Sequence, residues 1–114
     1  MNACPFCRIV AGEAPAEVLY RDDRVVAFQD SNPQAPVHFL VVPLEHIPSL
    51  AEVGDEHEEI VGHAVSVATT VARRQGIVER GFRLVVNCRR HGGQTIPHLH
   101  LHVLGGRQMT WPPG

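Results

Sequence analysis

The sequence of 114 residues predicts an α+β fold, in which a five-stranded antiparallel sheet is accompanied by one long and one short helix. Three observations predict it. Apolar stretches typical of strands are joined by short turns. One long amphipathic stretch, typical of a helix, separates the third predicted strand from the fourth, and a short helical stretch precedes the first predicted strand. Strands connected in this way favour antiparallel pairing over a doubly wound parallel sheet. Because the length is that of an ordinary domain, we expect residues 1–114 to form a single domain.

The N-terminal part is predicted to form a short helix and then three strands. Residues 4–11 form the helix, since Pro5 suits its first turn and Gly12 ends it. Two prolines and a Ser-Asn pair predict a loop at residues 31–36. The strand candidates are residues 18–21, 24–29 and 37–43, and the Asp22-Asp23 turn joins the first two as a hairpin.

The long helix is predicted at residues 55–75. Asp55 and Glu58 form a capping-box-like pair at its start, and Gly76 is a natural stop. The residues expected to form its buried stripe at helical spacing are Val61, Ala64, Val65, Ala68, Val71 and Ala72. After it, residues 82–88 and 98–104 are predicted as the last two strands, with a polar glycine-bearing turn between them.

Composition excludes several classes of protein. The formal charge of −2 leaves no basic surface for duplex nucleic acid, so any nucleotide partner is expected to be small. The ten basic residues are all arginines, which excludes a Schiff-base lysine and the lysine of a P-loop. The longest apolar stretch, residues 39–44, is too short to cross a membrane, and the N-terminus does not resemble a signal peptide. We therefore expect a cytoplasmic protein without membrane partners, whose three cysteines are metal ligands or packed thiols.

The candidate functional residues are concentrated in the segment 98–104. Side chains alternate between the two faces of a strand, so His98, His100 and His102 are predicted to lie on one exposed face. Leu99, Leu101 and Val103 are then expected to point into the core. Three interpretations follow from the residues themselves: a surface ladder without a role, a metal site, or phosphoryl transfer through a nucleophilic imidazole.

The flanking motifs give this pattern its context. The sequence resembles the histidine triad (HIT) family, and specifically its Hint branch in the bacterial form with a Cys-x-x-Cys pair. The residues that carry the resemblance are the segment 98–109, the ending Trp111-Pro112-Pro113-Gly114, and shorter stretches at 28–30, 33–39, 42–43, 46–47, 86–87 and 92–95.

The resemblance implies a homodimer whose sheets join, and hydrolysis of purine nucleoside phosphoramidates or aminoacyl adenylates with release of AMP or GMP. His100 would attack the α-phosphorus to form a nucleotidyl-histidine intermediate, which water hydrolyses. His102 would contact the phosphate and help to move protons, and His38 would orient the triad. No organic cofactor is implied.

The resemblance also implies a nucleotide site. Phe6, Ile9 and Phe28 would form an apolar slot for the base, although such residues are also typical of a core. The other implied contacts are Asp30 to the ribose hydroxyls, Asn87 to the ribose and phosphate edge, and Gly93, Gln94 and Thr95 to phosphate oxygens. For Gly92-Gly93 a plain hairpin turn is the simpler interpretation.

Cys4 and Cys7 form a second constellation. A Cys-x-x-Cys pair needs two more ligands to complete a tetrahedral zinc site, and the resemblance suggests His46 and His98. A redox pair and two unliganded packed thiols are the alternatives. Cys88 is expected to be a small core residue in a strand.

Three further points stay open at the level of sequence. The stretch Cys88-Arg89-Arg90-His91 departs from the family pattern beside the predicted phosphate loop and could alter substrate preference. The tail that carries Trp111 reaches towards the partner's active site in the Hint branch, or is simply a frayed terminus. A dinucleoside polyphosphate hydrolase, which breaks a phosphoanhydride bond, and a non-catalytic nucleotide-binding adaptor are the alternatives to the phosphoramidase.

Overall fold

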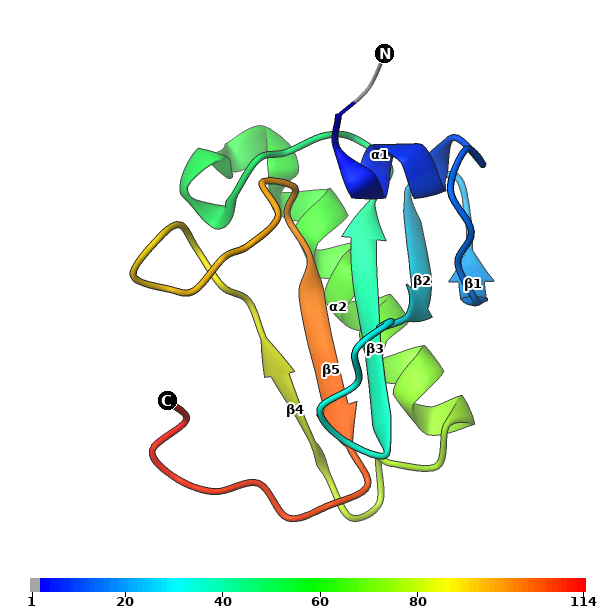
Figure 1. Cartoon of the computed structure of the whole chain (residues 1–114), viewed down its shortest axis with the longest axis vertical. Helices are drawn as coiled ribbons and strands as arrows, with labels where there is room; N and C mark the ends of the chain where they lie inside the picture. The colour runs from blue at the N-terminus through cyan, green and yellow to red at the C-terminus, as the bar shows by residue number, and fades with distance from the viewer. Residues whose placement is uncertain (1–2) are drawn as a thin grey trace.

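A computed structural model describes residues 3–114 and has the predicted α+β architecture. Five antiparallel strands form one sheet in the order β1-β2-β3-β5-β4. The long helix α2 crosses one face of the sheet, and the short helix α1 lies near the upper ends of β2 and β3 (Figure 1). The elements are α1 (Pro5–Val10), β1 (Val18–Arg21), β2 (Val25–Gln29), β3 (Val37–Pro43), the 3-10 turns η1 (Leu50–Glu52) and η2 (Asp55–His57), α2 (Glu58–Arg74), β4 (Phe82–Val85) and β5 (Leu101–Gly105).

The first four predicted elements are confirmed. The Sγ atom of Cys4 caps α1 by accepting the amide of Cys7 at 3.4 Å, and a proline occupies the first turn. The hairpin between β1 and β2 closes on Asp22, whose Oδ1 accepts the amides of Arg24 and Val25, both at 2.8 Å. The strand β3 has the predicted bounds, Val37–Pro43.

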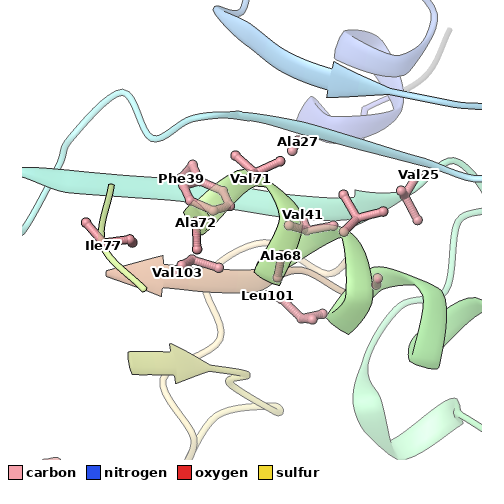
Figure 2. Close-up of a cluster of buried hydrophobic side chains, with 12 residues drawn as sticks. Val25, Ala27, Phe39, Val41, Ala68, Val71, Ala72, Ile77, Leu101 and Val103 are labelled. Carbon is pink, nitrogen blue, oxygen red and sulfur yellow. The ribbon is translucent and has the colours of Figure 1, made fainter. Parts of the chain in front are cut away.

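The main core lies between α2 and the sheet. Figure 2 shows Phe39 and Val41 of β3 and Val103 of β5 packed against Val71 and other apolar residues of the helix. Because side chains alternate along a strand, the residues between them point to the opposite face. There Leu40 and its neighbours form a second apolar cluster with residues of α1. The candidate active site is built on this second face.

Two details of the predicted helix are wrong. The amide of Gly54 donates to Nδ1 of His57 at 3.1 Å, so a 3-10 turn replaces the predicted Asp55–Glu58 capping pair. The buried stripe is rotated from the predicted one: Val65 is 44% exposed, whereas Val67 is buried. The stripe that faces the sheet is Ala64, Val67, Ala68, Val71 and Ala72.

The last two strands are shorter than predicted. β4 ends at Val85, where it pairs with His102, and β5 begins at Leu101. His98 and His100 therefore precede the strand and do not alternate along it. The chain leaves strand pairing there because the amide of Leu99 donates to Ile47 O, at 2.6 Å. The leucine and valine side chains of this segment are buried as predicted: Leu99, Leu101 and Val103.

Candidate active site

A cleft of about 700 Å³ opens on the sheet face opposite α2. Its lining comes from α1, the end of β2, the following loop, β3 and the segment 95–102. It brings together eight of the residues singled out in the sequence: Phe6, Ile9, Phe28, Asp30, His38, Thr95, His100 and His102.

Asn87, Gly93 and Gln94 do not line this cleft. The amide of Asn87 donates from Nδ2 to Gly92 O at 2.7 Å. The backbone amides of Gly93 and Gln94, expected to face a phosphate, donate to carbonyls of their own turn at 3.1 and 3.0 Å. In this structure the three residues shape the loop, and of this stretch Thr95 reaches the cleft.

One end of the cleft is apolar. The rings of Phe6 and Phe28 meet edge to face with centroids 5.6 Å apart, and both side chains are buried. The ring of Phe6 also lies 5.0 Å from that of His100. A flat apolar group seated at this end would therefore lie close to the histidines.

His100 has a fixed tautomer. Its Nδ1 lies 2.7 Å from the carbonyl oxygen of His98, which can only accept a hydrogen bond. The proton of the neutral ring is therefore on Nδ1, and the lone pair is on Nε2. A second-layer contact of this kind is how proteins decide which ring nitrogen is free to react.

The tautomers of His38 and His102 follow from the same reasoning. The amide of Gln34 donates to Nδ1 of His38 at 3.0 Å, so the proton of that ring is on Nε2. This proton faces Nδ1 of His102 at 3.0 Å, which leaves the His102 proton on Nε2. A directed chain of hydrogen bonds thus runs from Gln34 through His38 to His102.

Burial keeps these rings neutral. It is the largest cause that lowers the pKa of His38, opposed by the charge of Asp30. The pKa of His102 falls to about 4, because burial and the neighbouring rings of His100 and His38 disfavour the cation. The two rings therefore act near neutral pH through hydrogen bonds.

The predicted exposure of the triad is wrong. His98 is fully buried and His100 is 5% exposed, while His102 is half-buried. The sequence pattern could not show this, because α1 and the segment around residue 46 cover the ends of the strands. Of the three, His100 and His102 line the cleft on the sheet face opposite α2.

Asp30 lies in the cleft with its carboxylate partly engaged. Its Oδ1 accepts the amide of Asn32 at 2.8 Å. Its Oδ2 is 3.3 Å from Nε2 of His38 and 3.9 Å from Nδ1 of His102. The carboxylate stays within reach of a polar ligand in the cleft and lies beside the His38 ring.

A second cluster could hold a metal ion. Cys4, Cys7, His46 and His98 bring one donor atom each to within 4.8 Å of one another. Nδ1 of His46 is 3.1 Å from Cys7 Sγ and 3.2 Å from His98 Nδ1. Nδ1 of His98 lies 3.4 and 3.5 Å from the two sulfur atoms.

These donors fit a tetrahedral site. At ordinary zinc bond lengths, neighbouring ligand atoms are separated by roughly 3.3–3.7 Å, close to the distances seen here. Nε2 of His98 lies 2.9 Å from Pro43 O and carries the ring proton, which leaves Nδ1 free for a metal. Burial lowers the pKa of His98 and favours the neutral ring that a metal requires.

Sequence reasoning missed two features. Gln34 orients His38 through a backbone amide, a role that no residue type signals. A second cleft beside Thr95 is lined by Glu52, Arg89 and Arg90 among others, and the only signal for it was the unusual pair of arginines.

A cleft lined by histidines on one face of an antiparallel sheet is the defining feature of this site. Comparison with known proteins shows which family has it. The HIT domain profile matches residues 11–109, so the chain belongs to the histidine triad family. The purine nucleoside phosphoramidase of Escherichia coli K12 is 45% identical over 104 residues, covering 91% of this chain and 87% of the relative.

Solved structures agree with this assignment. A HIT family hydrolase from Legionella pneumophila Philadelphia 1 is 47% identical with a TM-score of 0.96, and the match covers 97% of this chain and 99% of that one. A zinc-bound histidine triad family protein from Mycobacterium smegmatis is 31% identical with a TM-score of 0.81, covering 92% of this chain and 76% of the other. Within residues 3–114, no helix has the length and apolar character needed to span a membrane.

Proposed function

We propose that the protein is a nucleotide hydrolase of the purine nucleoside phosphoramidase or aminoacyl-adenylate hydrolase type, which releases AMP or GMP. The observation that carries the proposal is the tautomer of His100, whose unprotonated Nε2 belongs to a side chain that lines the cleft. The named activity of the Escherichia coli relative supports the same substrate class.

The cleft accommodates a nucleotide in one direction. The purine would lie at the apolar end against Phe6, Ile9 and Phe28, and the ribose hydroxyls would face Asp30. This places the α-phosphate towards His100 and Thr95.

The position of the base is tested by measuring the AMP affinity of Phe28→Ala. We expect at least a tenfold loss of affinity. If the variant is destabilised but binds AMP normally, the base does not lie there.

The proposed reaction has two displacements. Nε2 of His100 forms a bond to the α-phosphorus while the bond from phosphorus to the amine breaks, and the amine leaves after taking up a proton from solvent. Water then attacks the phosphorus and gives up a proton to solvent, the bond to His100 breaks, and AMP or GMP is released. Dividing one difficult displacement into two easier ones is the benefit of covalent catalysis.

His102 and His38 support these steps. The Nε2–H group of His102 is free to donate to a phosphate oxygen and to help to move protons, because its Nδ1 is already engaged by His38. His38 is a positioning residue that sets this orientation. The Thr95 hydroxyl is a further donor to the phosphate.

We propose that the Cys4, Cys7, His46 and His98 cluster holds a structural zinc ion. Bound zinc would tie α1 to the segment around residue 46 and to the start of the catalytic segment. The four metal ligands would contribute to catalysis only indirectly. Zinc would hold His98 in place, and the carbonyl oxygen of His98 would then fix the ring of His100.

We also propose a homodimer with a joined sheet. In the sheet of residues 3–114, β4 is an edge strand and pairs only with β5. Nη2 of Arg83 donates to Thr110 O at 2.8 Å, so the tail begins beside this edge, and Trp111 is 82% exposed. A partner joined at β4 would meet that tail. A cytoplasmic location, which we propose as well, would keep the cysteines reduced.

The decisive experiment measures amine release from adenosine phosphoramidate by the wild type and by His100→Ala, together with AMP affinity for both. We expect turnover to vanish in the variant while AMP still binds. Failure of the wild type to turn over the compound despite binding AMP would favour the adaptor. Turnover of diadenosine polyphosphates alone would favour the dinucleoside polyphosphate hydrolase.

A further inference from the structure

A second cleft adjoins the proposed nucleotide cleft. It has a volume of about 650 Å³ and lies between the loop 89–97 and the segment 48–52. Thr95 lines both clefts. The two clefts are therefore neighbours at this residue.

The direction of the proposed substrate determines what would enter. With the base at the end formed by Phe6 and Phe28 and the phosphate near His100, the nucleoside occupies the first cleft. The group displaced from phosphorus must leave on the side away from the attacking nitrogen. In this orientation Thr95, which lines both clefts, lies at the phosphate end, so the second cleft is the neighbouring space available to the leaving group.

The second cleft carries an excess of positive charge. Arg89 and Arg90 line it, and Glu52 is its only acidic residue. Nη2 of Arg89 lies 2.8 Å from Oε1 of Glu52, so one guanidinium is matched by a carboxylate and the other is not. Arg90 forms no ion pair with another residue in the described range 3–114. The unpaired guanidinium of Arg90 makes this cleft suited to an anionic ligand.

The loop that carries these arginines is held in place. Arg89 has φ of +56° and is the one residue other than glycine with a positive φ among residues 3–114. Its amide donates to Oε1 of Gln94 at 2.8 Å, and Nε2 of Gln94 donates to Pro48 O at 2.8 Å. Glycine adopts this backbone without cost, whereas an arginine there is strained, and such strain is concentrated at functional positions.

We propose that Arg89 and Arg90 form a subsite for an anionic leaving group, so that the enzyme prefers nucleoside phosphoramidates whose amine carries a carboxylate or a phosphate-like group. The inference rests on the proposed function and names its substrate class. The anion takes no part in the bond changes: the phosphorus–nitrogen bond breaks, the amine takes up a proton, and the arginines hold its distant charged end.

The test uses adenosine phosphoramidates of three amines of similar length. β-Alaninamide is neutral, β-alanine adds a carboxylate, and aminoethylphosphonate adds a phosphonate. We expect kcat/KM for at least one anionic compound to exceed that for the neutral compound by about fivefold, the effect of one exposed ion pair at the upper end of the ordinary range, because Arg89 is already paired with Glu52. The preference should decrease as salt is added. The carboxylate and phosphonate arms identify which anion the cleft takes.

The variants are chosen to keep the fold. Arg89→Gly suits the positive φ, and Arg90→Gln changes an exposed side chain. Together they should reduce the ratio of anionic to neutral kcat/KM to about one. Arg73→Gln, an exposed arginine on α2 outside both clefts, is the matched control and should leave that ratio unchanged.

Binding separates this inference from the proposed function. Affinities of the three compounds for His100→Ala, with and without the two arginine changes, are measured alongside turnover. Arginine-dependent preference in binding without wild-type turnover would overturn the proposed function and leave the subsite standing. Turnover or binding that is equal for all three compounds, or a preference that survives the arginine changes, would overturn the subsite.

Discussion

Replacing His38 with leucine removes both hydrogen bonds of a buried imidazole while keeping a side chain of similar size. The ring is 4% exposed, accepts the amide of Gln34 and faces Nδ1 of His102. The variant leaves these two groups without their partners. It also frees His102 to place its proton on either nitrogen.

Two costs follow. Each buried polar group left unpaired costs about 1–3 kcal/mol, and His102 is partly reached by water, so we expect His38→Leu to lower the free energy of unfolding by about 2–4 kcal/mol. Loss of a residue that orients a catalytic side chain typically costs about 10- to 100-fold in activity. We therefore expect kcat for adenosine phosphoramidate to fall by that factor in molecules that remain folded.

Urea unfolding gives the stability, and the turnover assay is run well below the unfolding midpoint. His63→Leu is the matched control, because Nε2 of His63 lies 2.6 Å from Asp22 Oδ2, remote from the cleft lining. It should lower stability but not kcat. Full activity of folded His38→Leu would refute the proposed chain of hydrogen bonds, and an equal loss of kcat in both variants would show a general effect of destabilisation.

Three other predictions concern the core, the pH profile and the metal. Gly105→Ala should lower the free energy of unfolding by about 1–3 kcal/mol, because a Cβ there would lie 2.8 Å from Ile77 Cδ1. Gly62→Ala, with open space around it on α2, should stabilise by up to about 1 kcal/mol in the same urea titration. Burial lowers the pKa of His102 to about 4, so its ring should titrate by NMR at about pH 4; a titration of this ring centred near the ordinary histidine value of about 6.5 would contradict this. Purified protein should contain one zinc per chain, and Cys7→Ser should lose the metal and melt at a lower temperature; a wild type without zinc and a Cys7→Ser variant with an unchanged melting temperature would contradict the proposed structural zinc site.

The sequence predicted the regular elements best where local signals agree. Turn-forming residues and proline bound β3, and its apolar character made Val37–Pro43 predictable in full. The stripe of α2 was predicted wrongly in part because its valines do not all lie on one face of the helix. Only tertiary packing decides that Val67 faces the sheet and Val65 faces outwards.

The site was harder to predict from residues alone. Alternation correctly placed the leucines of the segment 98–104 in the core, but it could not show that His98 leaves the strand to join Cys4 and Cys7. That departure depends on contacts with a segment about fifty residues earlier in the chain, such as the bond from Leu99 to Ile47. The cleft with Arg89 depends likewise on η1, which carried no sequence signal.

The central claim is that His100 forms a bond to phosphorus, and the stereochemical course of hydrolysis tests it most directly. Adenosine phosphoramidate made chiral at phosphorus with sulfur is hydrolysed in water carrying heavy oxygen, and the configuration of the product is determined. Two displacements through His100 predict overall retention. Inversion would show direct attack by water and would contradict the covalent mechanism.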